Sequence, residues 1–313
     1  MGSIQRAAAL FCAVALGGLL AGCGASSSSG SPAEWSAASG TEASGAALPV
    51  VASTNIWGDV AATIGGDHVA VTSIISDPSA DPHGYEADAR NQLALSRAAL
   101  VIENGGGYDD FMDSMLAAAA TSAPVIDAVE VSGKEAAGAE LNEHVWYDFP
   151  TVAAVGREIA DQLSELDPAN AADYAANAET FAAALADLSG QVDGIKAQHA
   201  GTGIAITEPV PLYLIEAAGL DNLTPAEFSE AIETDTDVPV AVLNQTLALF
   251  TDKKVAALFY NEQTSGPQTE AVLAAATDAG IAVVPVRETL PDGKDYLQWM
   301  QDTVTAMKEA LDG

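Results

Sequence analysis

The chain has 313 residues, and its 44 acidic residues against 11 basic ones give a formal net charge of −33 at pH 7. Such a charge repels nucleic acid and anionic lipid headgroups, which argues against DNA or RNA binding. The length is sufficient for one large or two ordinary domains with proper cores.

The first 22 residues have the features of a lipoprotein signal peptide. Arg6 precedes an apolar run, 7–20, that is too short to span a bilayer. The run leads into Leu-Ala-Gly-Cys, which resembles the bacterial lipobox, where the cysteine is diacylated and becomes the new N-terminus. We therefore expect Cys23 to hold the mature chain on the membrane by its lipid alone. With Cys12 in the signal, no thiol remains for a disulfide or a metal site.

Residues 23–47, which begin with the lipidated cysteine, form a predicted tether. The segment consists mainly of serine, glycine and alanine, a composition that cannot bury enough apolar area to fold. The folded part is expected to run from 48 to 313.

Short β-branched runs alternate with segments of helical period in this part. Alternation of this kind favours parallel sheets with helices on both faces. Strands are predicted at 50–53, 69–75, 100–103, 125–127, 203–207, 255–260 and 281–286. Helices are predicted at 56–64, 89–97, 108–120, 212–218, 241–250, 269–279 and 296–311.

A long helix interrupts this alternation. Asp167 followed by Pro168 is typical of a helix start, and a helical period then continues to about Gln198 through Tyr174, Ala178, Phe181, Leu185, Leu188, Val192 and Ile195. We interpret the helix, 167–199, as a stiff connection between an N-terminal α/β lobe, 48–166, and a C-terminal α/β lobe, 200–313. An ordinary core helix within one domain is the alternative.

Four metal-binding side chains lie near predicted strand ends or in a short apolar segment. Ligands of open α/β sheets bind beyond the carboxyl ends of the strands. His83 in DPHGYE follows the strand at 69–75, Glu208 directly follows 203–207, and Glu288 lies two residues after 281–286. His144 lies in NEHVWYD. Two imidazoles and two carboxylates suit zinc, manganese or ferrous iron, and an ion bound by them would tie the two halves together.

Other residues are assigned lesser roles. Asp81 and Glu143 precede the two histidines and are candidates to orient them from the outer shell. Glu262 in YNEQT is the nearest rival of Glu288 as a ligand. His68 and His199 are interpreted as structural or surface residues.

Several motifs together resemble the zinc/manganese family of ABC-transporter solute-binding lipoproteins, the cluster A-I metal-binding proteins. The resemblance rests on DPHGYE, on HVWYD with Pro150 and a following helix, on the DP-N-x-x-x-Y sequence at 167–174, and on YNEQT and PVRETLP. It covers essentially all of 48–313.

This resemblance implies two α/β lobes joined by one rigid helix, with one divalent ion as cargo in the cleft between them. It places the family's four ligands on His83, His144, Glu208 and Glu288. It also implies an extracytoplasmic, lipid-anchored protein, expected to be a monomer, that delivers the ion to a membrane permease driven by a cytoplasmic ATPase.

The choice of ion stays open between zinc and manganese. The zinc branch often has a histidine-rich loop before the second ligand and a third histidine in the site, whereas 130–143 contains no histidine. Two histidines with two carboxylates resemble the manganese branch, but zinc binds most such sites more tightly.

Two other functions compete with a receptor, which would not be an enzyme. An exported metallohydrolase could use the same residue types, but no HExxH signature occurs. A surface adhesin, a label that some relatives have carried, is the third reading.

Overall fold

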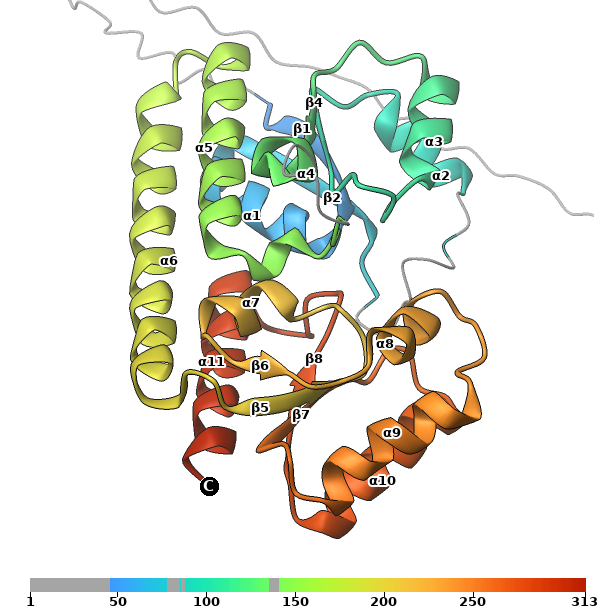
Figure 1. Cartoon of the computed structure of the whole chain (residues 1–313). Helices are drawn as coiled ribbons and strands as arrows, with labels where there is room; N and C mark the ends of the chain where they lie inside the picture. Colours follow the sequence, from blue (N-terminus) through green and yellow to red (C-terminus); the bar gives the residue numbers. More distant parts are fainter. Residues whose placement is uncertain (1–45, 78–84, 86–87, 135–140) are drawn as a thin grey trace, which may run out of the picture. The chain divides into compact units, whose positions relative to one another are not determined.

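The computed structural model describes residues 46–77, 85, 88–134 and 141–313 (Figure 1). The predicted signal peptide, Cys23 and nearly all of the tether lie outside these residues. Within them, no helix is long and apolar enough to cross a membrane.

Four parallel strands form the sheet of the first lobe, in the order β2-β1-β3-β4. β1 is buried along most of its length, and Val50 pairs with both Val71 and Leu100. Strands buried on both faces are typical of parallel sheets covered by helices. The strands are β1 (Leu48–Thr54), β2 (Val69–Ile75), β3 (Leu100–Glu103) and β4 (Val125–Asp127). The helices are α1 (Asn55–Gly65), α2 (Ala89–Leu95), α3 (Phe111–Ala119), α4 (Ala128–Ser132) and α5 (Phe149–Leu166), with short 3-10 turns η1 (Gly66–His68) and η4 (Val145–Tyr147).

A second parallel sheet, in the order β6-β5-β7-β8, forms the other lobe. β7 is buried at all five positions, so this sheet is also covered on both faces. Its strands are β5 (Gly203–Ile206), β6 (Asp221–Asn222), β7 (Ala257–Asn261) and β8 (Ala282–Val286). Its helices are α7 (Leu212–Ala217), α8 (Ala226–Glu233), α9 (Val240–Thr251), α10 (Pro267–Ala279) and α11 (Tyr296–Asp312). The predicted class, two α/β lobes with parallel sheets, is confirmed.

The long helix α6 (Ala171–His199) packs against elements of both lobes (Figure 1). It contacts α1 and α5 of the first lobe and α7 and α11 of the second. Its buried residues are the seven predicted from the helical period, from Tyr174 to Ile195. This arrangement favours the connecting helix over an ordinary core helix within one domain.

The predicted start of this helix at Asp167 and Pro168 is wrong. Asp167 follows the last residue of α5, and α6 begins only at Ala171. The Asp167 carboxylate accepts hydrogen bonds from Asn170 Nδ2 at 2.6 Å and Tyr174 Oη at 2.9 Å. The acidic residue therefore stabilises the turn between two helices.

Three hydrophobic clusters fill the described part of the molecule. The largest is continuous from β1 and α1 through α6 to β5, β8 and α11, so it joins the inner parts of the two lobes. The second lies beneath α8, α9 and α10 on the outer side of the second sheet. The third lies beneath α2 and α3 on the outer side of the first sheet.

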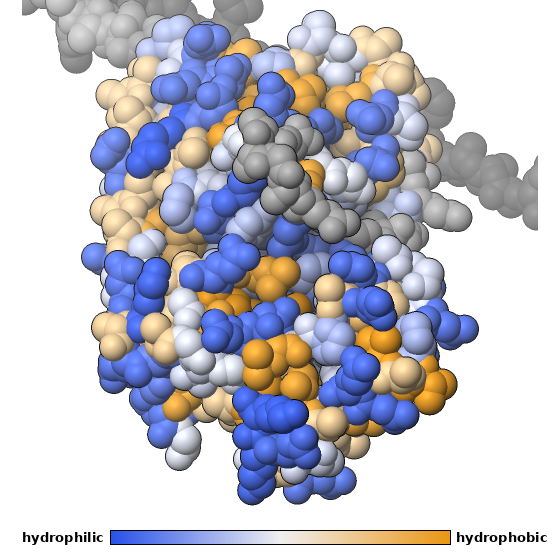
Figure 2. All heavy atoms as spheres, in the orientation of Figure 1, coloured by the Kyte–Doolittle hydropathy of each residue, from blue (hydrophilic) through white to orange (hydrophobic). Residues whose placement is uncertain are grey.

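The surface carries mostly hydrophilic side chains. On the face drawn in Figure 2, hydrophilic residues extend over both lobes and apolar ones form separate smaller areas. Large exposed apolar residues lie on different elements, such as Leu93 on α2, Leu166 on α5 and Val240 on α9. Isolated residues of this kind are normal for a protein surface.

Candidate metal centre

His144 lies immediately before η4 and is completely buried. Its Nδ1 atom lies 2.6 Å from Asn142 Oδ1, which also accepts a hydrogen bond from the His144 backbone N–H at 3.2 Å. Asn142 Nδ2 donates to the Pro209 carbonyl at 3.0 Å, which fixes the orientation of the amide. Nδ1 therefore donates a hydrogen bond to Asn142, and Nε2 is directed at the other side of the ring. Metal-binding histidines are held in the same way.

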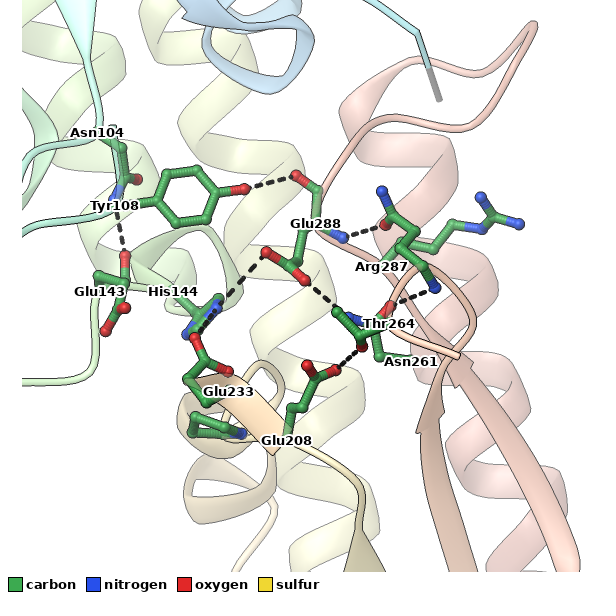
Figure 3. Close-up of polar contacts among 12 residues, drawn as sticks. Asn104, Tyr108, Glu143, His144, Glu208, Glu233, Asn261, Thr264, Arg287 and Glu288 are labelled. Atoms are coloured by element: carbon green, nitrogen blue, oxygen red, sulfur yellow. Dashed lines mark hydrogen bonds and ion pairs between the residues drawn. The ribbon is translucent and has the colours of Figure 1, made fainter. Parts of the chain in front are cut away.

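Two carboxylates face His144 Nε2 (Figure 3). Glu233 Oε1 lies 3.5 Å from this nitrogen and Glu288 Oε2 lies 4.0 Å from it. A third carboxylate, of Glu143, offers an oxygen within 4.8 Å of the ligand atoms of both His144 and Glu233. An imidazole nitrogen surrounded by carboxylate oxygens can bind a divalent transition metal.

Glu288 is held at the end of β8 by residues from two other segments of the chain, 261–263 and Tyr108. Asn261 Nδ2 donates to Glu288 Oε1 at 2.7 Å, and the Glu288 N–H donates to Gln263 Oε1 at 2.7 Å. Tyr108 Oη donates to the Glu288 carbonyl at 3.2 Å. The side chain of Glu288 is almost fully buried, so its position is set by the fold.

The structure places Glu288, and not Glu262, beside His144. The Glu262 side chain is 53% exposed and forms an ion pair with Arg287 at 2.7 Å. Neighbouring residues of this segment thus have different roles, since Arg287 binds the surface carboxylate while Glu288 is buried.

Glu208 follows β5 and is 2% exposed. Thr264 Oγ1 donates a hydrogen bond to its Oε2 atom (Figure 3). The helix that follows, α7, has no side-chain cap, so Glu208 does not cap it. Among the described residues, Glu208 lies outside the group formed by Glu143, His144 and Glu233.

The other predicted residues fall into two groups. His83 and Asp81 lie outside the described residues. His68 Nε2 contacts Asp173 at 3.2 Å, and His199 Nε2 contacts Asp312 at 3.1 Å. Both aspartates are at least half exposed, which agrees with the interpretation of these histidines as structural or surface residues.

A model of the family described as zinc-uptake complex component A, periplasmic, matches residues 50–310. The chain belongs to this family. The manganese-binding lipoprotein MntA of Halalkalibacterium halodurans is 29% identical over 253 residues, 73% of this chain and 78% of that protein. MntA of Bacillus subtilis is 26% identical over 247 residues, 75% and 78% of the two chains.

Solved structures of low sequence identity share the fold of this chain. The periplasmic zinc-binding protein TroA of Treponema pallidum has a TM-score of 0.69 and 20% identity, over 84% of this chain and 99% of TroA. A mutant structure of the laminin-binding adhesin of Streptococcus agalactiae has the same TM-score and 19% identity, again over 84% and 99%.

In this family member, an aromatic segment next to His144 connects the two lobes. Tyr147 Oη donates to the Arg287 carbonyl and accepts from the Arg287 N–H, both at 3.1 Å. Burial, partly offset by the bond from Arg287, raises the pKa of Tyr147 far above its usual value. The phenol therefore stays protonated, and it links the His144 segment directly to the Glu288 segment.

Sequence reasoning missed two residues of the site, Asn142 and Glu233. Asn142 lies two residues before His144, a spacing at which an asparagine side chain often accepts from the backbone, so a local signal was present. Glu233 lies in the acidic sequence EAIETDTD. Its pattern does not differ from that of a solvated helix end, and only the tertiary fold brings it to His144.

Proposed function

We propose that this chain is the extracytoplasmic solute-binding protein of an ABC transporter that captures Zn²⁺ or Mn²⁺ and delivers it to a membrane permease for uptake. Membership of the zinc-uptake component A family supports this function. The names of curated relatives, which are manganese-binding lipoproteins, support it as well.

The buried His144 ring is the observation that carries the proposal. Its Nδ1 is bound by Asn142, and its Nε2 faces carboxylate oxygens at 3.5 and 4.0 Å. Several partly or fully buried carboxylates around one imidazole are costly unless a cation balances their charge. The proposed cargo, a divalent ion, supplies that balance.

The proposed ligands are His83, His144, Glu208 and Glu288. For the last three, support comes from burial and from hydrogen bonds that fix their positions. Two neutral imidazoles and two carboxylates would neutralise a divalent ion.

The proposal also includes the location and the partners. Cys23 would bear the lipid, the tether at 23–47 would hold the folded part near the membrane, and a permease with its cytoplasmic ATPase would receive the ion. The protein is proposed to act as a monomeric receptor and not as an enzyme. Support for the anchor comes from the lipobox-like sequence and from the lipoprotein names of the relatives.

Replacement of His144 tests this function. His144→Ala should lower the affinity for Mn²⁺ and Zn²⁺ by about 100-fold or more, because a direct ligand is lost where even outer-shell partners are worth 10- to 100-fold. His199→Ala is the matched control, since His199 binds a surface aspartate, and its affinity should equal that of the wild type. Competition titration against a chelating indicator measures the affinities of the metal-free wild type and of the two variants.

The proposal is contradicted if the wild-type protein binds neither ion, or if His144→Ala binds both as tightly as His199→Ala does.

A further inference from the structure

Glu233 is the last residue of α8, and its carboxylate reaches the candidate centre from the outer layer of the second lobe. Its side chain is 13% exposed, and Oε1 lies 3.5 Å from His144 Nε2. It also lines a cleft of about 460 Å³, together with Gln263 and Thr264. Glu233 therefore borders this cleft and also faces the buried imidazole of His144 (Figure 3).

The end of α8 holds Glu233 in a defined place. Phe228 of the same helix is completely buried in the cluster beneath α8, α9 and α10. Asp235 has a φ of 48°, and the Thr236 N–H donates to the Ala231 carbonyl at 2.8 Å. A left-handed residue with this bond after a helix is a common C-terminal cap. The position of Glu233 is thus set by a capped helix end.

The separation of Glu233 and His144 fits two ligands of one ion. A distance of 3.5 Å exceeds the usual length of an N–H···O hydrogen bond. Two donors bound at about 2.1 Å and separated by a tetrahedral angle lie about 3.4 Å apart. An ion placed between the two atoms could therefore bind both without movement of either side chain.

We propose that Glu233 is a further carboxylate ligand of the captured ion and shifts its selectivity towards Mn²⁺. This inference rests on the proposed function. Glu233 adds a third carboxylate to Glu208 and Glu288, so the site becomes rich in oxygen donors. Manganese accepts such donors in octahedral geometry, whereas zinc is satisfied by four ligands. Loss of Glu233 should therefore cost more affinity for Mn²⁺ than for Zn²⁺.

Glu233→Gln tests this role because it keeps the size of the side chain and removes its charge. Glu230→Gln is the matched control, since Glu230 is exposed one turn earlier on α8. Each variant is titrated with Mn²⁺ and with Zn²⁺, and the visible absorption of bound Co²⁺ reports the coordination number. We expect Glu233→Gln to lose about tenfold or more in Mn²⁺ affinity, less in Zn²⁺ affinity, and to change the Co²⁺ spectrum.

Three outcomes are distinguished. If Glu233→Gln binds Mn²⁺ and Zn²⁺ with the same affinities as Glu230→Gln, while His144→Ala loses binding, Glu233 is not a ligand, although the proposed function stands. If both glutamine variants lose affinity equally and keep the wild-type Co²⁺ spectrum, the effect is one of general charge and the inference is wrong. Unchanged binding in His144→Ala would instead overturn the proposed function itself.

Discussion

His144 depends on its immediate neighbours in the chain for its orientation. Asn142, two residues earlier, holds both its backbone N–H and its ring Nδ1. Tyr213 Oη donates to the Asn142 carbonyl at 2.7 Å, and Asn142 Nδ2 reaches Pro209, so residues of the second lobe fix Asn142 in turn. The ring thus takes its orientation from contacts that involve both lobes.

Glu103 shows a different effect of burial on a carboxylate. It ends β3, and its Oε2 atom is buried without a hydrogen-bond partner among the described residues. Burial, together with the charges of Asp109, Asp127 and Asp113, raises its pKa from 4.5 to about 7. The folded protein therefore binds a proton here more tightly than the unfolded chain does.

This pKa predicts the sign of a pH effect on stability. Because the folded pKa is the higher one, ionisation of Glu103 reduces stability progressively as pH rises from about 4.5 to about 7, with no further loss above. Glu103→Gln should remove this contribution to the slope of the free energy of unfolding against pH. The full pKa shift of Glu103 corresponds to about 3 kcal/mol in the free energy of unfolding. Because the group is partly exposed, solvent screening reduces the stability that Glu103→Gln is expected to gain at pH 8 to about 1 kcal/mol.

Urea unfolding of Glu103→Gln and the wild type at pH 5 and pH 8 measures this difference. Glu179→Gln, at an exposed position of α6, is the control and should leave the slope unchanged. Equal slopes for Glu103→Gln and the wild type would show that the buried carboxylate does not titrate in this range.

At the level of elements, the segment that carries Glu288 is bound to the first lobe although it extends from the last strand of the second. Asn55 Nδ2 donates to the Leu290 carbonyl at 3.1 Å, and the Leu290 N–H donates to Asn55 Oδ1 at 2.8 Å. The Tyr296 N–H donates to Asp59 Oδ2 at 2.8 Å. The segment after β8 is therefore bound to both lobes, because α1 provides both acceptor side chains while Asn261 and Gln263 hold Glu288 itself.

Asn55→Ala should therefore weaken both stability and metal binding. Two hydrogen bonds between the lobes are lost, at a cost of about 1–3 kcal/mol in the free energy of unfolding, and Glu288 loses part of its support. Asn177→Ala is the control, since Asn177 binds the Ile64 carbonyl at 2.9 Å away from this segment. The control should lose stability but keep its Mn²⁺ affinity, as measured by urea unfolding and competition titration. Equal affinities of the two variants would show that this anchor does not support Glu288.

The elements also show how far the sequence predicts this structure. The buried face of α6 follows from a helical period, and seven of the eight strands among the described residues follow from β-branched runs, because both signals depend on local spacing. β6 has two residues, and α4 and α8 have five and eight, too few for a periodic signal. α5 was expected only from the family resemblance. Glu208 and Glu288 are predicted because ligands gather at strand ends, whereas Glu233 depends on the packing of α8 and has no such signal.

At the scale of the whole molecule, the largest hydrophobic cluster continues from the first sheet through α6 to the second. The outer clusters beneath α2 and α3 and beneath α8 to α10 are separate from it. His144 and Glu288 belong to segments bound to the central part, while Glu233 lies on an outer helix. An ion bound by all three would therefore connect an outer layer to the central frame.

The central claim is that one divalent ion binds at His144 between the two lobes. Crystals grown with Mn²⁺ and measured at the manganese absorption edge test it most directly. We expect one strong anomalous peak about 2.2 Å from His144 Nε2, with carboxylate oxygens of Glu288 and Glu208 around it. Anomalous peaks confined to surface carboxylates, with none near His144, would contradict it.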